Sequence, residues 1–214
     1  MTFYSARTTK FQIILNSAGF WLIMLSSYGG REGQDMPYTM YCDSPIGRLL
    51  LAEREGALVG VWMEGQKYFL GSFKEDREEK TDSGILNKTK EWLERYFKGE
   101  RPAVQELPLA PIGSDFRKEV WKILCEVPYG EVITYGEISR KIAGSHGLDR
   151  MSAQAVGGAV GHNPISIIIP CHRVVGANGS LTGYAGGLQR KIKLLMLEGV
   201  DMNHLFIPTK GTAL

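Results

Sequence analysis

Cysteine is scarce in this sequence of 214 residues. The three copies lie far apart, form no CxxC pair, and are Cys42, Cys125 and Cys171. An odd number of widely spaced cysteines excludes a disulfide framework and favours a reducing compartment, so we expect a cytoplasmic protein. None of the four histidines has ligand-like spacing with the cysteines, and we therefore expect no metal site.

The sequence also lacks an excess of charge of either sign. Its 25 lysines and arginines stand against 23 aspartates and glutamates, which leaves a formal net charge of only +2. The chain as a whole therefore does not attract polyanions, and any nucleic-acid surface must be local. Hydrophobic content of 43% and charged content of 22% are ordinary for a globular protein of one large or two small domains.

An uninterrupted hydrophobic run of transmembrane length is missing as well, and we expect no membrane partner. The apolar stretch 11–25 follows two basic residues as in a signal peptide, but polar residues interrupt it and no A-x-A-like site follows. Met36 then begins a segment typical of a domain start. We expect residues 1–35 to be an extension from a misplaced start, outside the fold. The alternatives are an export or membrane segment and a folded arm, and the N-terminal mass of the native protein decides among them.

Residues 36–110 are expected to form a small N-terminal domain. Strand patterns over 38–42, 48–53 and 57–63 are separated by short turns, which predicts an antiparallel meander. Nothing in this domain forms a convincing catalytic set, so we interpret it as support for the rest.

The second part of this domain alternates loop and helix. The charged stretch 74–83 is predicted to be a solvated loop, and 85–97 has helical spacing with Gly99 as its stop. The stretch 101–113 contains three prolines and is predicted to be a linker.

Residues 111–204 are expected to form a helical C-terminal domain, followed by a tail over 205–214. Ser114 is a good N-cap for a helix that ends near residue 128. Thr134 and Glu137 fit a capping box that opens a short helix to about residue 143. A third helix is expected from about 151 to 160, and with its predecessor it makes a helix-turn-helix candidate.

The third of these helices is nearly bare of side chains. Interior glycine costs a helix about 1 kcal/mol relative to alanine, so the composition needs a reason. Either the helix packs closely against another element, or its smooth face approaches a bulky partner such as a DNA groove. The small residues are Ala153, Ala155, Gly157, Gly158 and Ala159.

Positive charge gathers in the same part of the chain. Between residues 134 and 198, seven basic residues against three acidic ones leave an excess of +4, which favours phosphate contact. The basic residues are Arg140, Lys141, Arg150, Arg173, Arg190, Lys191 and Lys193.

The stretch 167–176 carries the chemistry. Three isoleucines lead into Pro170, and the trio Cys-His-Arg follows at 171–173. A buried apolar run predicts a strand that enters the core and that the proline ends. A cysteine at such a strand end is partly accessible and next to positive charge, which is the setting of a reactive thiolate. A buried structural cysteine beside a surface His-Arg pair is the alternative.

A glycine-rich loop with one tyrosine covers 181–187, and a helical pattern over 188–198 follows with Gly199 as its cap. The loop is either merely flexible or the wall of a pocket in which the ring of Tyr184 stacks on a flat ligand. Glu198 at a helix C-terminus is unfavourable for the helix dipole. We therefore expect it to have a partner, with His172 as the candidate.

The sequence Pro-Cys-His-Arg-Val-Val at 170–175 resembles the signature of the methylated-DNA–protein-cysteine methyltransferases, also called O6-alkylguanine-DNA alkyltransferases. Residues 116–135, 155–164 and 182–199 also resemble the family's pattern in order and spacing. The resemblance implies an α+β fold. A small ribonuclease H-like N-terminal domain with an antiparallel sheet would precede a helical, winged-helix-like C-terminal domain with a helix-turn-helix.

The resemblance further implies DNA repair by direct reversal. The methyl or alkyl group of O6-alkylguanine, and of O4-alkylthymine, would move to the protein's own cysteine in one irreversible turnover. The partner would be double-stranded DNA containing alkylated guanine, bound through the minor groove by a monomer, with the damaged base flipped into a pocket. A thioether product has no labile bond, so each molecule would act once, with neither a metal nor an organic cofactor.

Each site residue follows from a match to the family's pattern. Cys171 would be the nucleophile, His172 its base and Glu198 the group that orients the histidine. Asn163 would help to fix the site and contact the histidine. The substrate-binding and DNA-binding set comprises Tyr135 as a hydroxyl donor toward the purine, Tyr184 as a pocket wall, and Gln154, Ala155, Gly157, Gly158 and Arg173.

Adjacent side chains of an extended chain point to opposite faces, so Cys171 and His172 would not bond directly. Either the backbone turns sharply after Pro170 or a water relays the proton, and we favour the water. Gln154 departs from the family, in which many members carry an arginine that fills the space of the flipped base. Glutamine brings no charge and less reach, and Arg150, one turn earlier on the same helical face, is expected to compensate in part.

Three other functions would also use a cysteine near a helix-turn-helix. A relative that senses alkylated bases without repair would have its cysteine replaced, whereas Cys171 is present. A helix-turn-helix regulator with a thiol sensor would need an effector domain. A cysteine hydrolase would not explain the bare helix.

Overall fold

A four-stranded sheet carries the first part of the computed structural model, which describes residues 37–71, 73 and 77–209. Strands β1 (Tyr38–Cys42), β2 (Leu49–Arg54) and β3 (Ala57–Met63) form the expected antiparallel meander. The two-residue strand β4 (Glu78–Glu79) pairs parallel to β1, so the stretch 74–83 is not loop throughout. The strand order is β3-β2-β1-β4. The expectations for residues 1–35 lie outside the described residues.

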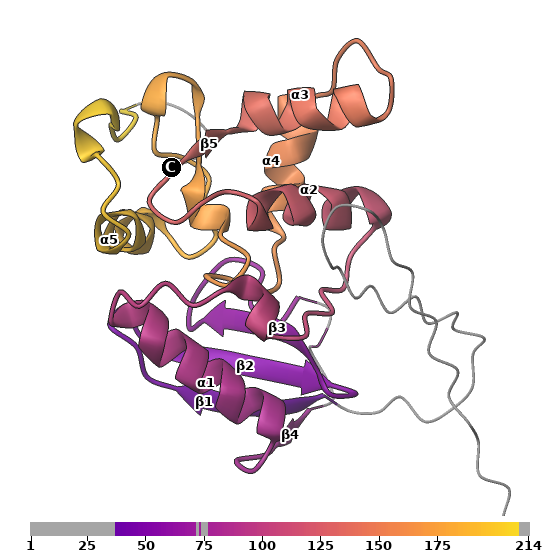
Figure 1. Cartoon of the computed structure of the whole chain (residues 1–214), viewed down its shortest axis with the longest axis vertical. Coiled ribbons are helices and arrows are strands. Elements are labelled where there is room, and N and C mark those ends of the chain that lie inside the picture. Colours follow the sequence, from indigo (N-terminus) through magenta and orange to yellow (C-terminus); the bar gives the residue numbers. More distant parts are fainter. Residues whose placement is uncertain (1–36, 72, 74–76, 210–214) are drawn as a thin grey trace, which may run out of the picture. The chain divides into compact units, whose positions relative to one another are not determined.

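Helix α1 (Gly84–Phe97) packs on one face of this sheet (Figure 1). The Ser83 side chain accepts a hydrogen bond from the Leu86 amide at its start, and Gly99, with φ of +80°, ends it as expected. Alternate residues of β2 face opposite sides, because strand side chains alternate. A second, smaller apolar cluster lies on the far face of the sheet and comprises Leu50, Ala52, Val59, Trp62 and Leu70.

The proline-containing stretch 101–113 is not a free linker. Leu107 is buried, and the backbone of Leu58 in β3 bonds to Pro108 and Ala110 at 2.8 Å each. The prediction of a linker was wrong because proline excludes a segment from a central strand but does not exclude backbone pairing at the edge of a sheet. The stretch also contains the short 3-10 helix Val104–Glu106.

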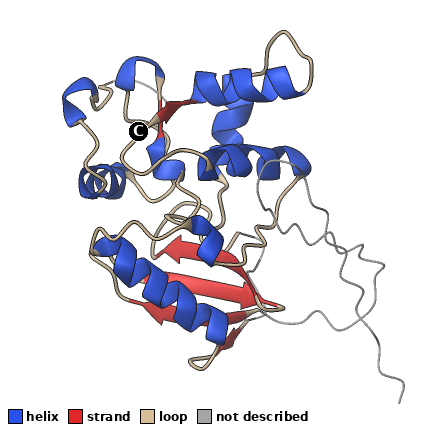
Figure 2. Cartoon of the chain, viewed as in Figure 1, coloured by secondary structure: helices blue, strands red, loops and turns tan. Residues whose placement is uncertain are grey.

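Among the described residues, four α-helices build the second part, grouped apart from the four-stranded sheet (Figure 2). They are α2 (Asp115–Cys125), α3 (Tyr135–Ser145), α4 (Ala153–Gly161) and α5 (Leu188–Leu197). The two-residue strands β5 (Ile133–Thr134) and β6 (Val174–Val175) pair in parallel between them. In the described part of the chain, no helix has both the length and the apolar character needed to cross a membrane.

The start signals of these helices are the expected ones. Ser114 caps α2, and Thr134 and Glu137 form the capping box of α3. Ser152 caps α4 by accepting a hydrogen bond from the Ala155 amide. The cap at Ser152 leaves Arg150 in the preceding loop, so the prediction that Arg150 shares a helical face with Gln154 is wrong.

The three isoleucines at 167–169 do not form the expected strand. They make a tight turn in which Ile167 has φ of +74°, the Ile168 amide bonds to the Ser166 carbonyl, and the Ile169 amide bonds to the Ile165 carbonyl. All three side chains are at most 1% exposed. Burial produced the apolar run here, and burial alone does not distinguish a strand from a buried turn.

Candidate active site

Cys171 begins a 3-10 helix, Cys171–Arg173, directly after Pro170. The backbone therefore turns sharply at Pro170, in agreement with one of the two alternatives for this stretch. The Cys171 side chain is 5% exposed, and the Asn163 amide nitrogen donates to its sulfur at 3.0 Å. Because three consecutive residues of a 3-10 helix project in different directions, the thiol, the imidazole and the guanidinium enter different surroundings.

Asn163 follows the last turn of α4 and fixes the segment that leads to the cysteine. Its side-chain nitrogen also donates to the Ile169 carbonyl at 2.8 Å, and its oxygen accepts from the Ile165 amide at 3.0 Å. The expected contact of Asn163 with the histidine is replaced by the contact with Cys171. A buried amide with these partners holds both ends of the isoleucine turn and the sulfur in register.

His172 is completely buried and bonds through Nε2 to Oε1 of Glu198 at 2.7 Å. Within the described residues its Nδ1 is buried without a hydrogen-bond partner. A proton on Nε2 suits the carboxylate, so Nδ1 is the nitrogen left to accept one. Burial lowers the pKa of His172 although Glu198 opposes this, so the ring is neutral at neutral pH.

Glu198 is the C-cap residue of α5, where the helix dipole disfavours a carboxylate, and it has the expected partner, His172. Besides His172, it accepts from Nε and Nη2 of Arg173 at 2.7 and 3.0 Å, and from the Tyr96 hydroxyl at 2.6 Å. Burial by itself would raise the pKa of Glu198, but hydrogen bonds from His172 and Arg173 lower it far below its usual range. The carboxylate is therefore ionised at neutral pH.

Arg173 does not face a DNA surface, so its predicted DNA contact is corrected. It is 8% exposed, and its remaining nitrogen, Nη1, donates to the Val127 carbonyl at 2.7 Å. All three guanidinium nitrogens are thus engaged inside the protein. Arg173 balances the buried charge of Glu198, since a buried carboxylate is stable only with such partners.

Lys191 is likewise inside the protein, where its ammonium is not accessible to phosphate. It is fully buried, and its ammonium donates to the carbonyls of Val174 at 2.5 Å and Thr182 at 2.8 Å. Burial lowers the pKa of Lys191 to about 8. Arg190 donates to the carbonyls of Ile46, Gly186 and Glu64. Sequence cannot tell such buried cations from exposed ones, so the local charge excess overstated the phosphate-binding surface.

The thiol of Cys171 is protonated at rest. Burial raises its pKa, while the Asn163 hydrogen bond and the charge of Lys191 oppose the rise. A sulfur in this state becomes a nucleophile only when a base removes its proton. No hydrogen bond joins the Cys171 sulfur to the His172 ring among the described residues, so a proton that moves between them would need a relay.

Tyr135 and the glycine-rich loop lie against each other beside the sulfur. The Tyr135 hydroxyl donates to the carbonyls of Thr182 and Gly183 at 3.4 Å, and burial raises its pKa to about 12. Gly183 has φ of +69°, and a Cβ atom there would lie 2.6 Å from the Tyr135 oxygen, so glycine is needed for this approach. Tyr184 meets His172 edge to face, with ring centroids 6.5 Å apart.

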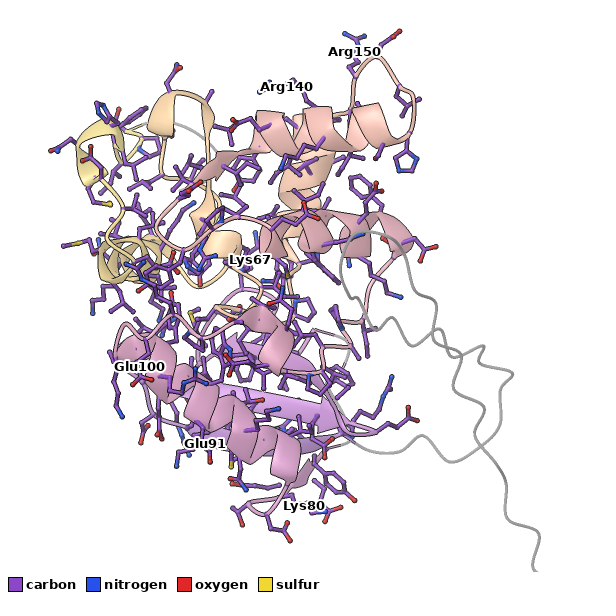
Figure 3. All side chains as sticks on the ribbon, in the orientation of Figure 1. Lys67, Lys80, Glu91, Glu100, Arg140 and Arg150 are labelled. Carbon is purple, nitrogen blue, oxygen red and sulfur yellow. The ribbon has the colours of Figure 1, made fainter. Side chains whose placement is uncertain are left out.

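The outer face of α4 is smooth and exposed. Gln154, Ala155 and Gly158 are exposed, and a Cβ added at Gly158 would meet nothing within 4 Å. Gly157 instead faces inward, where a Cβ would lie 3.8 Å from the Tyr135 ring. The basic side chains of Arg140 and Arg150 lie at the α3 end of the molecule, far from Lys80 in the sheet domain (Figure 3).

Tyr96 is the functional candidate that the sequence did not reveal. It lies within the stretch 85–97, which the sequence predicts to be helical, and α1 buries it to 2% exposure. Its hydroxyl crosses from the sheet domain to Glu198, 102 residues further along the chain. A buried tyrosine usually finds a partner for its hydroxyl, but which partner depends on long-range packing that the local pattern does not contain.

Comparison with known proteins finds two family models that together span most of the chain. The 6-O-methylguanine DNA methyltransferase ribonuclease-like domain matches residues 36–111, and the DNA binding domain of the same name matches residues 115–200.

Named relatives agree with these matches. The methylated-DNA–protein-cysteine methyltransferase of Methanosarcina acetivorans is 44% identical over 170 residues, which is 77% of this chain and 99% of that protein. The protein of the same name from Haemophilus influenzae is 39% identical over 163 residues, 76% of this chain and 87% of its own. The crystal structure of Mycobacterium tuberculosis OGT in complex with DNA superposes with a TM-score of 0.65 at 42% identity, covering 75% of this chain and 92% of that one.

Proposed function

Because the chain belongs to the 6-O-methylguanine DNA methyltransferase family, we propose that its Cys171 accepts the alkyl group of O6-alkylguanine in double-stranded DNA. The activity follows from membership of this family. The chain repairs DNA by transferring an alkyl group to a cysteine of its own, and DNA is its partner. A non-repairing DNA-binding or regulatory protein is not favoured, since the relatives described above are named as methyltransferases.

The contact of Asn163 with the Cys171 sulfur, next to the buried His172–Glu198 pair, carries the choice of cysteine. Burial raises the pKa of Cys42 to about 11 and that of Cys125 to about 12. Neither is preceded or followed in the sequence by a histidine, and no hydrogen bond to a base is found for either thiol within the described part of the chain. Cys171 is also buried, but the residue that follows it, His172, has an acceptor nitrogen, Nδ1, that is buried without a partner among the described residues.

The proposed transfer begins with the thiol proton. It passes from Cys171 through one water to Nδ1 of His172, and Glu198 stabilises the imidazolium that forms. The sulfur then attacks the alkyl carbon, the S–C bond forms, and the bond between that carbon and O6 of guanine breaks. The departing guanine takes a proton, which the Tyr135 hydroxyl helps to supply. Tyr135 and Tyr184 enclose the flipped base.

The product explains why one molecule would act once. A thioether has no labile bond, and Cys42 in β1 and Cys125 in α2 lie in other elements and offer no exchange. The reaction requires neither a metal nor an organic cofactor, because the alkyl carbon is itself the electrophile.

We also propose how DNA approaches. The exposed face of α4, with Gln154, Ala155 and Gly158, lies in the minor groove, and Gly157 leaves room for the Tyr135 ring behind it. Small side chains favour this mode, because a groove admits a smooth helix more closely than a bulky one. The Gln154 side chain fills the space that the flipped base leaves, and it does so less well than arginine because it is shorter and uncharged. Binding by a monomer, action in the cytoplasm and acceptance of O4-alkylthymine belong to the same proposal, as does the domain boundary at residues 110–111.

Transfer of a labelled methyl group tests the assignment of the cysteine. DNA carrying a labelled O6-methylguanine is incubated with the wild type, Cys171→Ala and the matched control Cys125→Ala. We expect label on the peptide that contains residue 171, none on Cys171→Ala, and full labelling of Cys125→Ala. Duplex binding by Cys171→Ala should stay within about twofold of the wild type, because no DNA contact is removed. Transfer by Cys171→Ala would refute the assignment.

A further inference from the structure

The sheet domain reaches the catalytic pair through one buried tyrosine. Tyr96 lies in the last turn of α1, and its ring stacks on Trp92 at 5.6 Å with an interplanar angle of 8°. The Trp92 indole donates to the Ala103 carbonyl at 2.9 Å, and Phe97 meets Tyr96 edge to face. A buried ring packed against two aromatic neighbours has little rotational freedom, so its hydroxyl has a fixed direction.

The Tyr96 hydroxyl is directed at the same Glu198 oxygen that bonds to His172. It donates to Oε1 of Glu198 at 2.6 Å and lies 3.4 Å from Nε2 of His172, which bonds to the same oxygen at 2.7 Å. Burial and the charge of Glu198 raise the pKa of Tyr96 well above its usual value, so the hydroxyl keeps its proton and acts as a donor. Together with Nη2 of Arg173 at 3.0 Å, three donors therefore share this carboxylate oxygen.

We propose that Tyr96 is a positioning residue for alkyl transfer: its hydroxyl holds the Glu198 carboxylate in line with His172 and takes up part of its negative charge. This inference rests on the proposed function, because it assigns His172 the task of accepting the Cys171 proton. It gives the sheet domain a part in the chemistry, through a residue that touches neither the sulfur nor DNA.

The proposal predicts the direction of a pH effect. A carboxylate that loses one donor has more negative potential left for its remaining partners, so the imidazolium form of His172 becomes more stable. His172 must be neutral to take the thiol proton, and it would then stay protonated to a higher pH. The titratable and charged groups that face this pair from the surrounding elements are Tyr96, Tyr129, Arg173, Tyr184 and Lys191.

Tyr96→Phe isolates the hydroxyl, and Tyr129→Phe is the matched control. The Tyr129 ring lies 6.1 Å from that of Tyr96, but its hydroxyl donates to the Leu197 carbonyl and not to Glu198. The second-order rate of methyl transfer to duplex DNA is measured from pH 5 to 9 for all three proteins. We expect Tyr96→Phe to be about 10-fold slower at neutral pH, with the acid limb of its profile shifted upward, since a charge-assisted hydrogen bond is lost. Tyr129→Phe should keep the wild-type rate and profile.

A second substitution keeps the hydroxyl and reverses the sign. 3-Fluorotyrosine at position 96 is a stronger donor, so it should withdraw more charge from Glu198 and move the acid limb to lower pH. This variant decides the question if Tyr96→Phe does not fold. A wild-type acid limb in both variants, or a slower Tyr96→Phe with an unshifted limb, would overturn the proposal and leave Tyr96 a packing residue. Absence of transfer by the wild type would instead refute the proposed function.

Discussion

At the scale of the residue, Glu198 joins the chemistry of the site to the stability of the fold. Its side chain is fully enclosed, yet Tyr96, His172 and Arg173 all donate to it. A buried ion of this kind is tolerable only while its partners remain, and removing one member leaves the other charge uncompensated. The contacts proposed to orient His172 therefore also make folding depend on the ionisation of one carboxyl group.

The substitution Glu198→Gln tests that dependence. At pH 7 we expect it to lower the free energy of unfolding by about 3–5 kcal/mol, because buried Arg173 loses its counter-charge. The folded pKa of Glu198 is lowered, so its stabilising contribution is full above the unfolded pKa of about 4.3 and is lost as the pH falls below it.

Urea unfolding between pH 3 and 7 measures both effects, with Glu119→Gln as the control. Glu119 pairs with His146 at the surface, where an ion pair contributes less than about 1 kcal/mol. The wild type should lose its advantage over Glu198→Gln as the pH falls below about 4. A constant difference across the whole range would show that Glu198 does not titrate as argued.

The contacts of a single residue were predictable from sequence where the residue departs from a local preference of secondary structure. Glu198 at a helix C-terminus signalled a partner, and His172 is that partner. The roles of Arg173, Lys191 and Tyr96 followed no local rule, because each depends on a contact with a distant segment. A basic residue read from sequence is assumed to be exposed, and two of these three are buried cations.

At the scale of the element, α4 is distinguished by its lack of large side chains on the exposed face. Its exposed face carries no side chain larger than Gln154 in the positions proposed to enter the groove, while Val156, Ala159 and Val160 bury the other face. The helix also accepts the Trp121 indole proton at the Ala159 carbonyl, at 2.9 Å, which ties it to α2. A rigidly backed, smooth helix suits insertion into a groove.

Gln154 is the position on which this element can be tested. Repair rates on duplex DNA are compared for the wild type, Gln154→Arg and Gln154→Ala. We expect Gln154→Arg to be a few-fold faster, because a longer cation fills the space of the flipped base, and Gln154→Ala to be about 10-fold slower. Single-stranded substrate supplies the control, since no partner base has to be replaced there. Equal rates for all three proteins on duplex DNA would mean that the position is idle.

Elements were predictable where capping chemistry marks them. Ser114, Thr134 with Glu137, and Gly99 placed helix ends from sequence because caps satisfy backbone groups locally. The isoleucine turn at 167–169 was missed because its conformation is imposed from outside, by Asn163 and by pairing with β3. Tertiary contacts of this kind leave no local pattern.

At the scale of the whole molecule, Arg190 of α5 fastens the helical domain to the sheet domain. Its Nε donates to the Ile46 carbonyl at 2.9 Å and its Nη2 to the Glu64 carbonyl at 3.0 Å. With Tyr96 on Glu198 and the pairing at Val61, this contact makes the two domains one structural unit around the site. The family resemblance and the strand and helix patterns predicted both domains, whereas no local feature predicted how they dock.

Arg190→Ala should therefore destabilise docking. We expect the free energy of unfolding to fall by about 2–4 kcal/mol, because charge-assisted bonds to backbone carbonyls are lost and the carbonyls stay partly buried. Thermal unfolding measures the change, and Lys193→Ala on the exposed side of α5 should stay within about 0.5 kcal/mol of the wild type. An equally small change for Arg190→Ala would show that the domains dock without this clamp.

The pairing of β3 has a consequence for solubility. β3 is the outer strand of its sheet, and an open strand edge invites pairing with other chains and aggregation. Here Leu58 pairs with the stretch 108–110, and the Val61 backbone bonds to Pro164 and Ser166 at 2.9 Å each. The segment that leads from Asn163 to the Cys171 sulfur thus also covers a sheet edge. A change that detaches this segment from β3 would expose an aggregation-prone strand edge and would displace the Cys171 thiol at the same time.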